Sequence, residues 1–245
     1  MQSKSPAKYY RVGIDIGGTK IKTILWNGKK ILKSLETPTP QNKKRLENEL
    51  KNIFKKLKPK NGADFSIGIA AAGVVKNTTL VFAPNIPKIK NFDFRKVFPE
   101  NVSLAVDNDA RAFLKAEIAP GSAKKTKRVF GLTVGTGVGR AFAKNGVVQK
   151  IKKFEEPEIW EKEYQKIRNK NILANFLGAN VSKLAKKYEP EIIVVGGGLG
   201  RQKNFFNKFA SFLRINGIKG EIRRSKLGKY AAAIGASLLS KRINS

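Results

Sequence analysis

Residues 10–26 read YRVGIDIGGTKIKTILW, in which two apolar runs are separated by a paired-glycine turn. The alternation of apolar and polar residues in 10–16 and 20–26 is typical of strands with one buried face. Residues 30–35 (KILKSL) predict a third strand, and the Asn-Gly pair before them favours a tight hairpin. The chain therefore opens with three sequential antiparallel strands.

The same arrangement recurs in the second half of the chain. Residues 128–134 (RVFGLTV) predict a strand, residues 135–139 (GTGVG) a glycine turn, and residues 140–143 (RAFA) the returning strand. This repetition predicts an α/β protein with two similar lobes around a central cleft. We expect residues 1–108 and 109–245 to form these lobes, with the C-terminal helix able to pack back on the first lobe.

Hydrophobic periodicity predicts the remaining elements. Apolar residues spaced three and four apart favour helices, whereas short continuous apolar runs favour buried strands. Helices are expected at residues 42–58, 111–117, 156–187 (one or two), 204–216 and 229–242, and strands at residues 65–72, 101–106 and 191–195.

Two residue types are missing from the chain, which has 245 residues but no Cys and no His. Their absence excludes disulfides, thiol nucleophiles, Cys-bearing zinc sites, Ser-His-Asp triads and His general bases. Any catalysis must therefore depend on Asp, Glu, Lys, Ser, Thr, backbone amides and a bound cation. The polar N-terminus and the lack of a long apolar run predict a cytoplasmic protein without a membrane span.

The chain is strongly basic, with 50 Lys and Arg against 18 Asp and Glu and a formal net charge of +32. Such an excess favours polyanionic partners, which include nucleotides, polyphosphate and nucleic acid. A lysine-rich solvated surface is the alternative interpretation. The lysine runs lack regularly interleaved aromatic residues, so the sequence gives little support for a platform that stacks single-stranded bases.

The first glycine turn is a candidate phosphate site. Gly17 and Gly18 let the backbone approach an anion closely, so that amides and the Thr19 hydroxyl can bind phosphate oxygens. Lys20 adds positive charge, and Asp15, at the end of the strand, can hold Mg²⁺ directly or through water. An ordinary hairpin turn is the alternative.

Two further glycine motifs are candidates for binding a phosphoryl donor. The first follows the strand at 128–134, but it precedes a strand and lacks the G-K-[ST] sequence of a P-loop. The second follows the buried strand at 191–195, where close packing between strand and helix is the alternative. The candidate residues are Gly135, Thr136, Gly137, Gly139, Gly196, Gly197 and Gly198.

Asn108 and Asp109 lie between a predicted strand and a predicted helix. An Asp at such a strand end can point into a cleft, where it could accept a proton from a hydroxyl that attacks phosphorus. The alternative is that one of the two residues only caps the helix.

Taken together, these motifs resemble those of the ROK family of sugar kinases, in the actin/hexokinase/heat-shock-70 superfamily. The resemblance extends over nearly the whole chain. It depends on DIGGTK at 15–20, GIAAAGVV at 68–75, APNIP at 83–87, ND at 108–109, GTGVG at 135–139, GGG at 196–198 and AAAIGASLL at 231–239. It implies two actin-like, ribonuclease H-like lobes.

The resemblance also implies roles for particular residues. Asp109 corresponds to the general base, Asn85 to a residue that contacts the sugar, and Asn108 to a second residue at the sugar hydroxyls. The implied donor is ATP or polyphosphate with Mg²⁺, and the implied acceptor is a hexose; a homodimer is compatible with the family. The implied nucleotide contacts are Gly17, Thr19, Gly135, Thr136 and Gly197.

The chain departs from the family pattern after its second Asn-Gly pair. The usual E-x-G-H sugar motif is absent, and so is the His-and-Cys zinc motif, so no zinc is expected. Glu155 and Glu156 are candidate replacements for the missing sugar carboxylate; the alternative is that they lie at the solvated start of a helix. Arg111 and Arg140 replace residues that are usually small or Asn. This compact layout resembles most the polyphosphate glucokinase branch.

The leading hypothesis is therefore a Mg²⁺-dependent kinase that transfers a phosphoryl group from ATP or polyphosphate to a hexose hydroxyl. A non-catalytic homologue that binds a sugar or nucleotide is an alternative, because the E-x-G-H motif is missing. A nucleic-acid-binding regulator is a third hypothesis, based on the charge. It is disfavoured because the first strand begins by about residue 10, which leaves no room for a winged helix before it.

Overall fold

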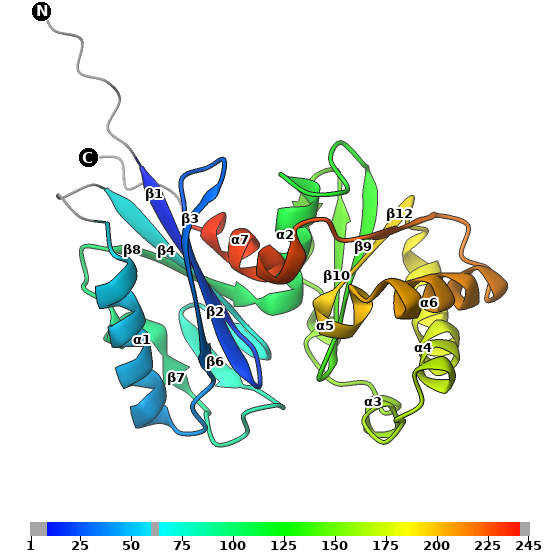
Figure 1. The fold of residues 1–245 in the computed structure, drawn as a ribbon, viewed down its shortest axis with the longest axis horizontal. Helices are drawn as coiled ribbons and strands as arrows, with labels where there is room; N and C mark the ends of the chain where they lie inside the picture. The colour runs from blue at the N-terminus through cyan, green and yellow to red at the C-terminus, as the bar shows by residue number, and fades with distance from the viewer. Residues whose placement is uncertain (1–8, 60–63, 241–245) are drawn as a thin grey trace, which may run out of the picture. The chain divides into compact units, whose positions relative to one another are not determined.

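The computed structural model describes residues 9–59 and 64–240, which form two compact units (Figure 1). Unit 1 comprises Met1–Ala112 and Ala232–Ser245, and unit 2 comprises Phe113–Ala231. Each unit contains a five-stranded mixed sheet with helices on its faces, so the expected α/β fold class is confirmed. The polar residues 1–8, on which part of the localisation expectation rested, lie outside the described residues.

The sheet of unit 1 has the order β3-β2-β1-β4-β8. The first three strands are sequential and antiparallel, as predicted, and β4 and β8 continue the sheet parallel to β1. The strands span Tyr10–Ile16 (β1), Lys20–Trp26 (β2), Ile31–Pro38 (β3), Phe65–Ala71 (β4) and Ser103–Asn108 (β8).

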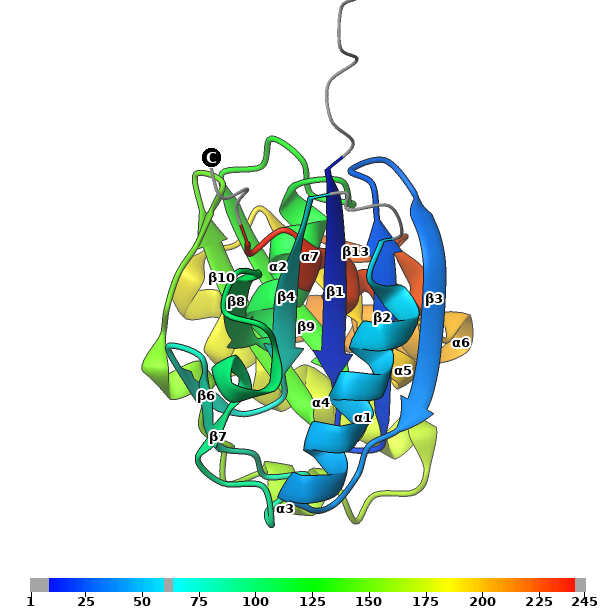
Figure 2. The same cartoon turned by 90° about the vertical axis from the view of Figure 1, so that its left-hand side faces the viewer.

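Opposite faces of this sheet pack against different helices, because side chains alternate along a strand. Val12, Ile14 and Ile16 share one core with α1 (Lys43–Leu57). On the other face, a Cβ atom at Gly13 would lie 1.9 Å from the carbonyl oxygen of Ala233 in α7 (Ala231–Ser237). Figure 2 shows α1 in front of the sheet and α7 behind it. A side chain at position 13 would therefore push α7 off the sheet.

The sheet of unit 2 has the order β11-β10-β9-β12-β13 and repeats this design. Its middle strand β9 pairs antiparallel with β10 and parallel with β12, as β1 does with β2 and β4. Gly131 of β9 faces α2 at Leu114, in the way that Gly13 of β1 faces α7. The strands span Arg128–Val134 (β9), Val138–Lys144 (β10), Val147–Val148 (β11), Ile192–Gly196 (β12) and Glu221–Arg224 (β13).

The helices of unit 2 lie on both faces of this sheet. Alternate residues of β9, such as Phe130 and Leu132, share a core with residues of α4 and α6. Figure 1 shows α4 and α6 together on one side of β9 and β12. The helices are α2 (Asp109–Ile118), which begins in unit 1, α3 (Glu161–Tyr164), α4 (Lys170–Ala185), α5 (Gly197–Gly200) and α6 (Lys203–Ile215).

Several short elements were not predicted. They are β5 (Val74–Lys76), β6 (Thr79–Phe82) and β7 (Phe92–Asp93), which form a separate three-stranded sheet, the edge strand β13, and the 3₁₀ helices η1 (Phe94–Val97), η2 (Lys152–Phe154), η3 (Lys186–Tyr188) and η4 (Gly228–Tyr230).

The stretch at 156–187, for which one or two helices were expected, contains two, α3 and α4, and Asn169 caps the second. The helix expected at 229–242 is regular only over α7, and residues 241 and 242 lie outside the described residues. Within the described ranges, no helix is long and apolar enough to cross a lipid bilayer.

Candidate functional site

Two carboxylates of unit 1 lie at the carboxyl edge of its parallel strands. Asp15 is in register with Ala70, which is in register with Asp107, and Asp109 opens α2 directly after β8. In α/β sheets, ligands bind beyond this edge, where the loops that follow the strands meet. The fold therefore brings the predicted metal ligand and the predicted base to the same edge.

Asp15 is a buried carboxylate, only 8% exposed. Burial raises its pKa from 3.8 to about 7, and the nearby Asp109 adds to the increase. The Lys22 ammonium, whose Nζ atom lies 3.8 Å from the Asp15 carboxylate, opposes this change. Lys22 was not among the predicted site residues, because strand alternation alone does not show which lysine lies beside the aspartate.

Asn108, not Asp109, supplies the principal cap of α2. Its Oδ1 atom accepts hydrogen bonds from the amides of Ala110, at 3.0 Å, and Arg111, at 3.3 Å. Its Nδ2 atom donates to the carbonyl of Gly73 at 3.0 Å, which ties the helix start to the loop after β4. The capping interpretation thus applies to Asn108, whose side chain is largely committed to the backbone.

Asp109 makes one hydrogen bond to a neighbouring residue, from the Ala110 amide at 2.9 Å. Burial raises its pKa, while the Ala110 amide and the positive charges of Arg111 and Lys22 act in the opposite direction. Arg111 itself is held by Asp107, with its Nε atom 2.6 Å from Oδ1. Asp109 is therefore a carboxylate of raised pKa whose position is fixed by the start of α2.

The first glycine loop is closed by hydrogen bonds and packs against Asn85. The Gly17 amide donates to the Lys20 carbonyl at 3.1 Å, and the Thr39 hydroxyl donates to the Gly17 carbonyl at 2.7 Å. A Cβ atom at Gly18 would lie 2.6 Å from the Cβ atom of Asn85. The structure thus brings together two motifs that are 67 positions apart in the sequence.

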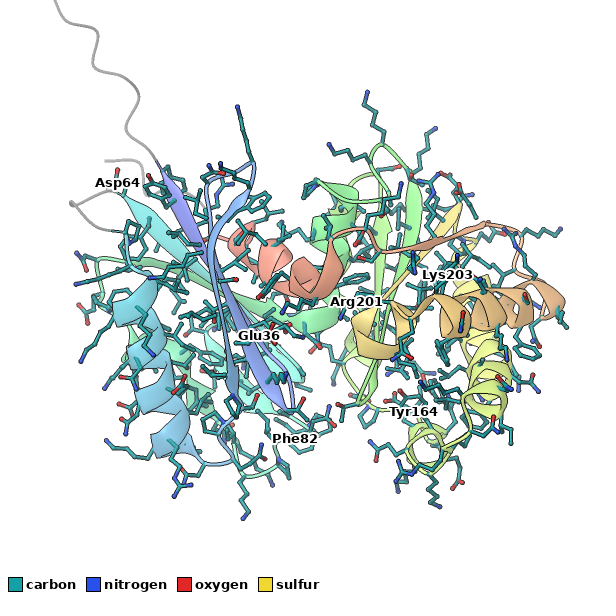
Figure 3. The ribbon with its side chains drawn as sticks, in the orientation of Figure 1. Glu36, Asp64, Phe82, Tyr164, Arg201 and Lys203 are labelled. Atoms are coloured by element: carbon teal, nitrogen blue, oxygen red, sulfur yellow. The ribbon has the colours of Figure 1, made fainter. Side chains whose placement is uncertain are left out.

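The exposed side of this loop carries the predicted polar residues. Thr19 and Lys20 are both exposed, and Lys20 lies 3.7 Å from Glu36 of β3, which is labelled in Figure 3. Thr39, which holds the loop through Gly17 and through the Thr19 carbonyl, was not predicted. It follows β3 in the sequence TPTP, which gives no signal for this contact.

The two glycine motifs of unit 2 adjoin each other. Gly196 of β12 is in register with Thr133 of β9, just before the second glycine loop. Gly197 has a φ of +82°, and a Cβ atom there would lie 2.4 Å from the Val134 carbonyl oxygen. A Cβ atom at Gly198 would meet nothing within 4 Å, so open space lies beside the motif.

The second glycine loop is a tight turn with an exposed tip. The Gly135 amide donates to the Gly137 carbonyl at 3.0 Å, Thr136 is exposed, and Gly139 pairs with Thr133 within the hairpin. The hydroxyl of Tyr164, labelled in Figure 3, donates a hydrogen bond to the Gly135 carbonyl. Tyr164 lies 29 positions from Gly135, and no sequence pattern connects them.

Glu155 and Glu156 lie in unit 2, between η2 and α3, and not at the start of a helix. The Glu155 amide closes η2 on the Lys152 carbonyl, and Glu156 uses its main-chain carbonyl to accept a hydrogen bond from Arg140. Whether either carboxylate reaches a sugar stays a prediction.

Comparisons with known proteins show the family of this chain. Residues 11–151 match the model of the ROK family. The N-acetylgalactosamine kinase AgaK of Shewanella sp. (strain ANA-3) is 32% identical over 146 residues, which are 56% of this chain and 46% of that protein. The chain therefore matches about half the length of its curated relatives.

Solved structures share the fold over most of the chain. A ROK family glucokinase from Streptomyces griseus, in complex with glucose and AMPPNP, has a TM-score of 0.80 at 20% identity. The similarity covers 94% of this chain and 99% of that one. An inorganic polyphosphate/ATP-glucomannokinase from Arthrobacter sp. strain KM has a TM-score of 0.76 at 22% identity. That similarity covers 94% of this chain and 97% of the glucomannokinase chain. Because the family model matches more than half of the sequence, this chain belongs to the ROK family.

Proposed function

We propose that this protein is a hexose kinase that transfers a phosphoryl group from ATP or polyphosphate to a sugar hydroxyl. The observation that carries the proposal is the placement of Asp109. It opens α2 at the carboxyl edge of the unit 1 sheet, is fixed by the Asn108 cap, and has a raised pKa. A carboxylate held in this way is suited to accept a proton.

In the proposed reaction, the hydroxyl oxygen of the hexose attacks the terminal phosphorus of the donor. The bond from that phosphorus to the bridging oxygen breaks, and the hydroxyl proton passes to Asp109. The products are a sugar phosphate and either ADP or a polyphosphate shortened by one unit. The raised pKa makes the Asp109 carboxylate a stronger base than an exposed Asp, which favours the proton transfer.

Asn85 is the stronger of the two asparagine candidates for binding sugar. The Oδ1 atom of Asn108 and one of its amide protons already serve the backbone, through α2 and Gly73. The side chain of Asn85 has no hydrogen-bond partner among the described residues, and it packs beside Gly18. Its amide group can therefore accept from one sugar hydroxyl and donate to another.

The glycine loops would bind the phosphoryl donor. In unit 1 the candidates are the amides of Gly17 and Gly18, the Thr19 hydroxyl and the Lys20 ammonium; in unit 2 they are residues 135–139 and 196–198. Backbone amides and positive charge can stabilise a phosphate chain without a P-loop. The complex of the related S. griseus glucokinase with glucose and AMPPNP supports ATP as the donor.

The residues present fit a Mg²⁺ ion. Mg²⁺ prefers oxygen ligands and binds through one or two carboxylates together with substrate phosphates. Asp15 is buried beside Asp109, and this burial opposes its negative charge and raises its pKa to about 7. Bound there, Mg²⁺ would neutralise charge on the donor phosphates. Within the described residues, no group of three or more acidic side chains could hold a metal by itself, so water and phosphate would complete the set.

A substrate panel tests the proposal directly. Glucose, mannose, N-acetylglucosamine and N-acetylgalactosamine are each combined with ATP, GTP or polyphosphate, with Mg²⁺ or with EDTA, and sugar phosphate is measured. We expect turnover with at least one pair, dependence on Mg²⁺, and loss of turnover in Asp109→Asn. Thermal stabilisation by a sugar or nucleotide without product would instead identify a non-catalytic binding protein.

A further inference from the structure

The second glycine loop is tied at both ends to one short segment of unit 2. This segment, residues 156–164, is called the loop brace below. At the start of the loop, Tyr164 donates its hydroxyl proton to the Gly135 carbonyl. Immediately after the loop, Arg140 of β10 donates from Nη2 to the Glu156 carbonyl at 2.8 Å. The two ties enclose residues 135–140, which contain the turn between β9 and β10 and the first residues of β10.

Arg140 makes the second tie in a buried place. Its side chain is only 2% exposed, and its Nη1 atom lies 2.8 Å from Oε1 of Glu161. The same Glu161 oxygen accepts the Glu158 amide at 3.0 Å, so the carboxylate holds the brace in shape as well as binding the arginine. A buried guanidinium without this partner would be costly, so the pair fixes β10 against the brace.

Aromatic packing connects the brace to the rest of unit 2. The Arg140 guanidinium lies 5.8 Å from the centre of the Trp160 ring. The same ring makes an edge-to-face contact with Phe176 of α4. Tyr164 is buried in the core of unit 2. Burial, with a smaller effect of Glu161, raises the pKa of Tyr164 to about 12, so its hydroxyl remains a hydrogen-bond donor throughout the neutral range.

We propose that Tyr164 and the Arg140–Glu161 pair are positioning residues, which hold the Gly135–Gly139 loop in the conformation that binds the phosphoryl donor. This inference rests on the proposed function. Glycine-rich turns lose more conformational freedom than other turns when they become ordered. Interactions that order the loop before the donor arrives therefore lower the cost of binding.

The test compares two tyrosines of the same unit. Tyr164→Phe removes the hydroxyl that ties the loop and keeps the ring. Tyr188→Phe is the matched control, because Tyr188 packs against Phe142 and Phe154 but makes no hydrogen bond to the loop. Affinity for ATP is measured by calorimetry, steady-state kinetics gives the KM for each substrate, and hydrogen exchange reports on the amides of residues 135–139.

For Tyr164→Phe we expect the Kd and KM for ATP to rise about five- to tenfold, with the hexose KM unchanged. A tenfold change corresponds to about 1.4 kcal/mol. Exchange of the loop amides should quicken by a similar factor, and the control should change neither quantity. Glu161→Gln should also quicken exchange, because a neutral amide binds Arg140 more weakly.

Two results would overturn the proposal: loop exchange as slow in Tyr164→Phe as in Tyr188→Phe, or equal affinity of both variants for ATP. The exchange experiment needs no ligand, so it tests whether the brace orders the loop independently of the reaction. A wild-type protein that shows slow loop exchange but binds neither ATP nor polyphosphate would contradict the proposed function and, with it, the role of the brace in donor binding. Loss of loop protection in Tyr164→Phe would still show that the tie orders the loop.

Discussion

A Cβ atom at position 18 would lie 2.6 Å from the Cβ atom of Asn85, so the first glycine loop is in direct contact with the residue proposed to bind the sugar. Real Cβ atoms essentially never approach so closely. Gly18→Ala should therefore displace Asn85, the loop or both, and we expect the KM for hexose and for ATP to rise together, by about tenfold, if each loses one hydrogen bond. Kinetics with each substrate varied in turn gives both values.

Asn85→Ala is the control for this prediction. It keeps the Cβ atom that packs against Gly18 and removes only the amide group. The hexose KM should rise while the KM for ATP stays the same. If Gly18→Ala leaves both KM values at those of the wild type, the contact has no part in substrate binding.

Asp109→Asn should lower kcat by at least about 10²-fold, the usual scale for a positioned general base. The Asn side chain can still accept the Ala110 amide and carries no buried charge, so the melting temperature should not fall. Asn108→Ala, in contrast, removes the cap of α2 and should lower the free energy of unfolding by about 0.5–2 kcal/mol. Turnover of Asp109→Asn at the wild-type rate would show that Asp109 is not the base.

The titration of Asp15 predicts how stability depends on pH. Because burial raises its pKa from 3.8 to about 7, the folded protein keeps a proton on Asp15 that the unfolded chain releases between these pH values. The contribution of Asp15 to the free energy of unfolding is therefore greatest below pH 3.8, and it is lost as the pH rises through about 7. Asp15→Asn does not titrate, so it should gain stability relative to the wild type between pH 4 and pH 8, by up to about 4 kcal/mol.

Urea unfolding at pH 5 and pH 8, with EDTA present, measures this difference. Glu47→Gln on α1 is the control, because the hydrogen bond from Lys51 lowers the pKa of the Glu47 carboxyl below its ordinary value of 4.5. Glu47 is therefore already ionised in the folded and unfolded protein at pH 5, and the stability of this variant relative to the wild type should stay nearly constant between pH 5 and pH 8. Parallel curves for wild type and Asp15→Asn would contradict the prediction for Asp15.

Much of the fold could be predicted because its signals are local. The strands β1, β2, β9 and β12 can each be predicted from the apolar pattern of their own residues, and glycines mark the turns that follow β1 and β9. The sheet of β5, β6 and β7 was missed because strands of two to four residues are too short to show a period. The break before α4 did have a signal in the sequence, because Asn is a common N-cap residue. In the structure, the Asn169 side chain accepts the amides of Asn171 and Ile172.

The candidate site was predictable only where motifs mark it. The contacts that complete it join distant positions: Gly18 with Asn85, Asn108 with Gly73, and Tyr164 with Gly135. Each depends on how a helix or loop packs in three dimensions, which a single sequence does not reveal. Arg140 was visible as a departure from the family pattern, but its partner Glu161 could not be chosen among several nearby acids.

Gly197 and Gly198 are adjacent in the sequence, but the structure gives them different surroundings. Gly197 has a φ of +82°, and a Cβ atom there would lie 2.4 Å from the Val134 carbonyl oxygen and 2.6 Å from the Val134 amide nitrogen. Gly197→Ala should therefore lower the free energy of unfolding by about 1–3 kcal/mol, through backbone strain and a clash with the backbone of β9. Gly198→Ala meets open space and should stay within about 0.5 kcal/mol of the wild type. Urea unfolding distinguishes the two variants. If Gly198→Ala weakens ATP binding while its stability is unchanged, the open space beside it is where the donor lies; if neither variant changes ATP affinity, the motif serves only to pack β12 against β9.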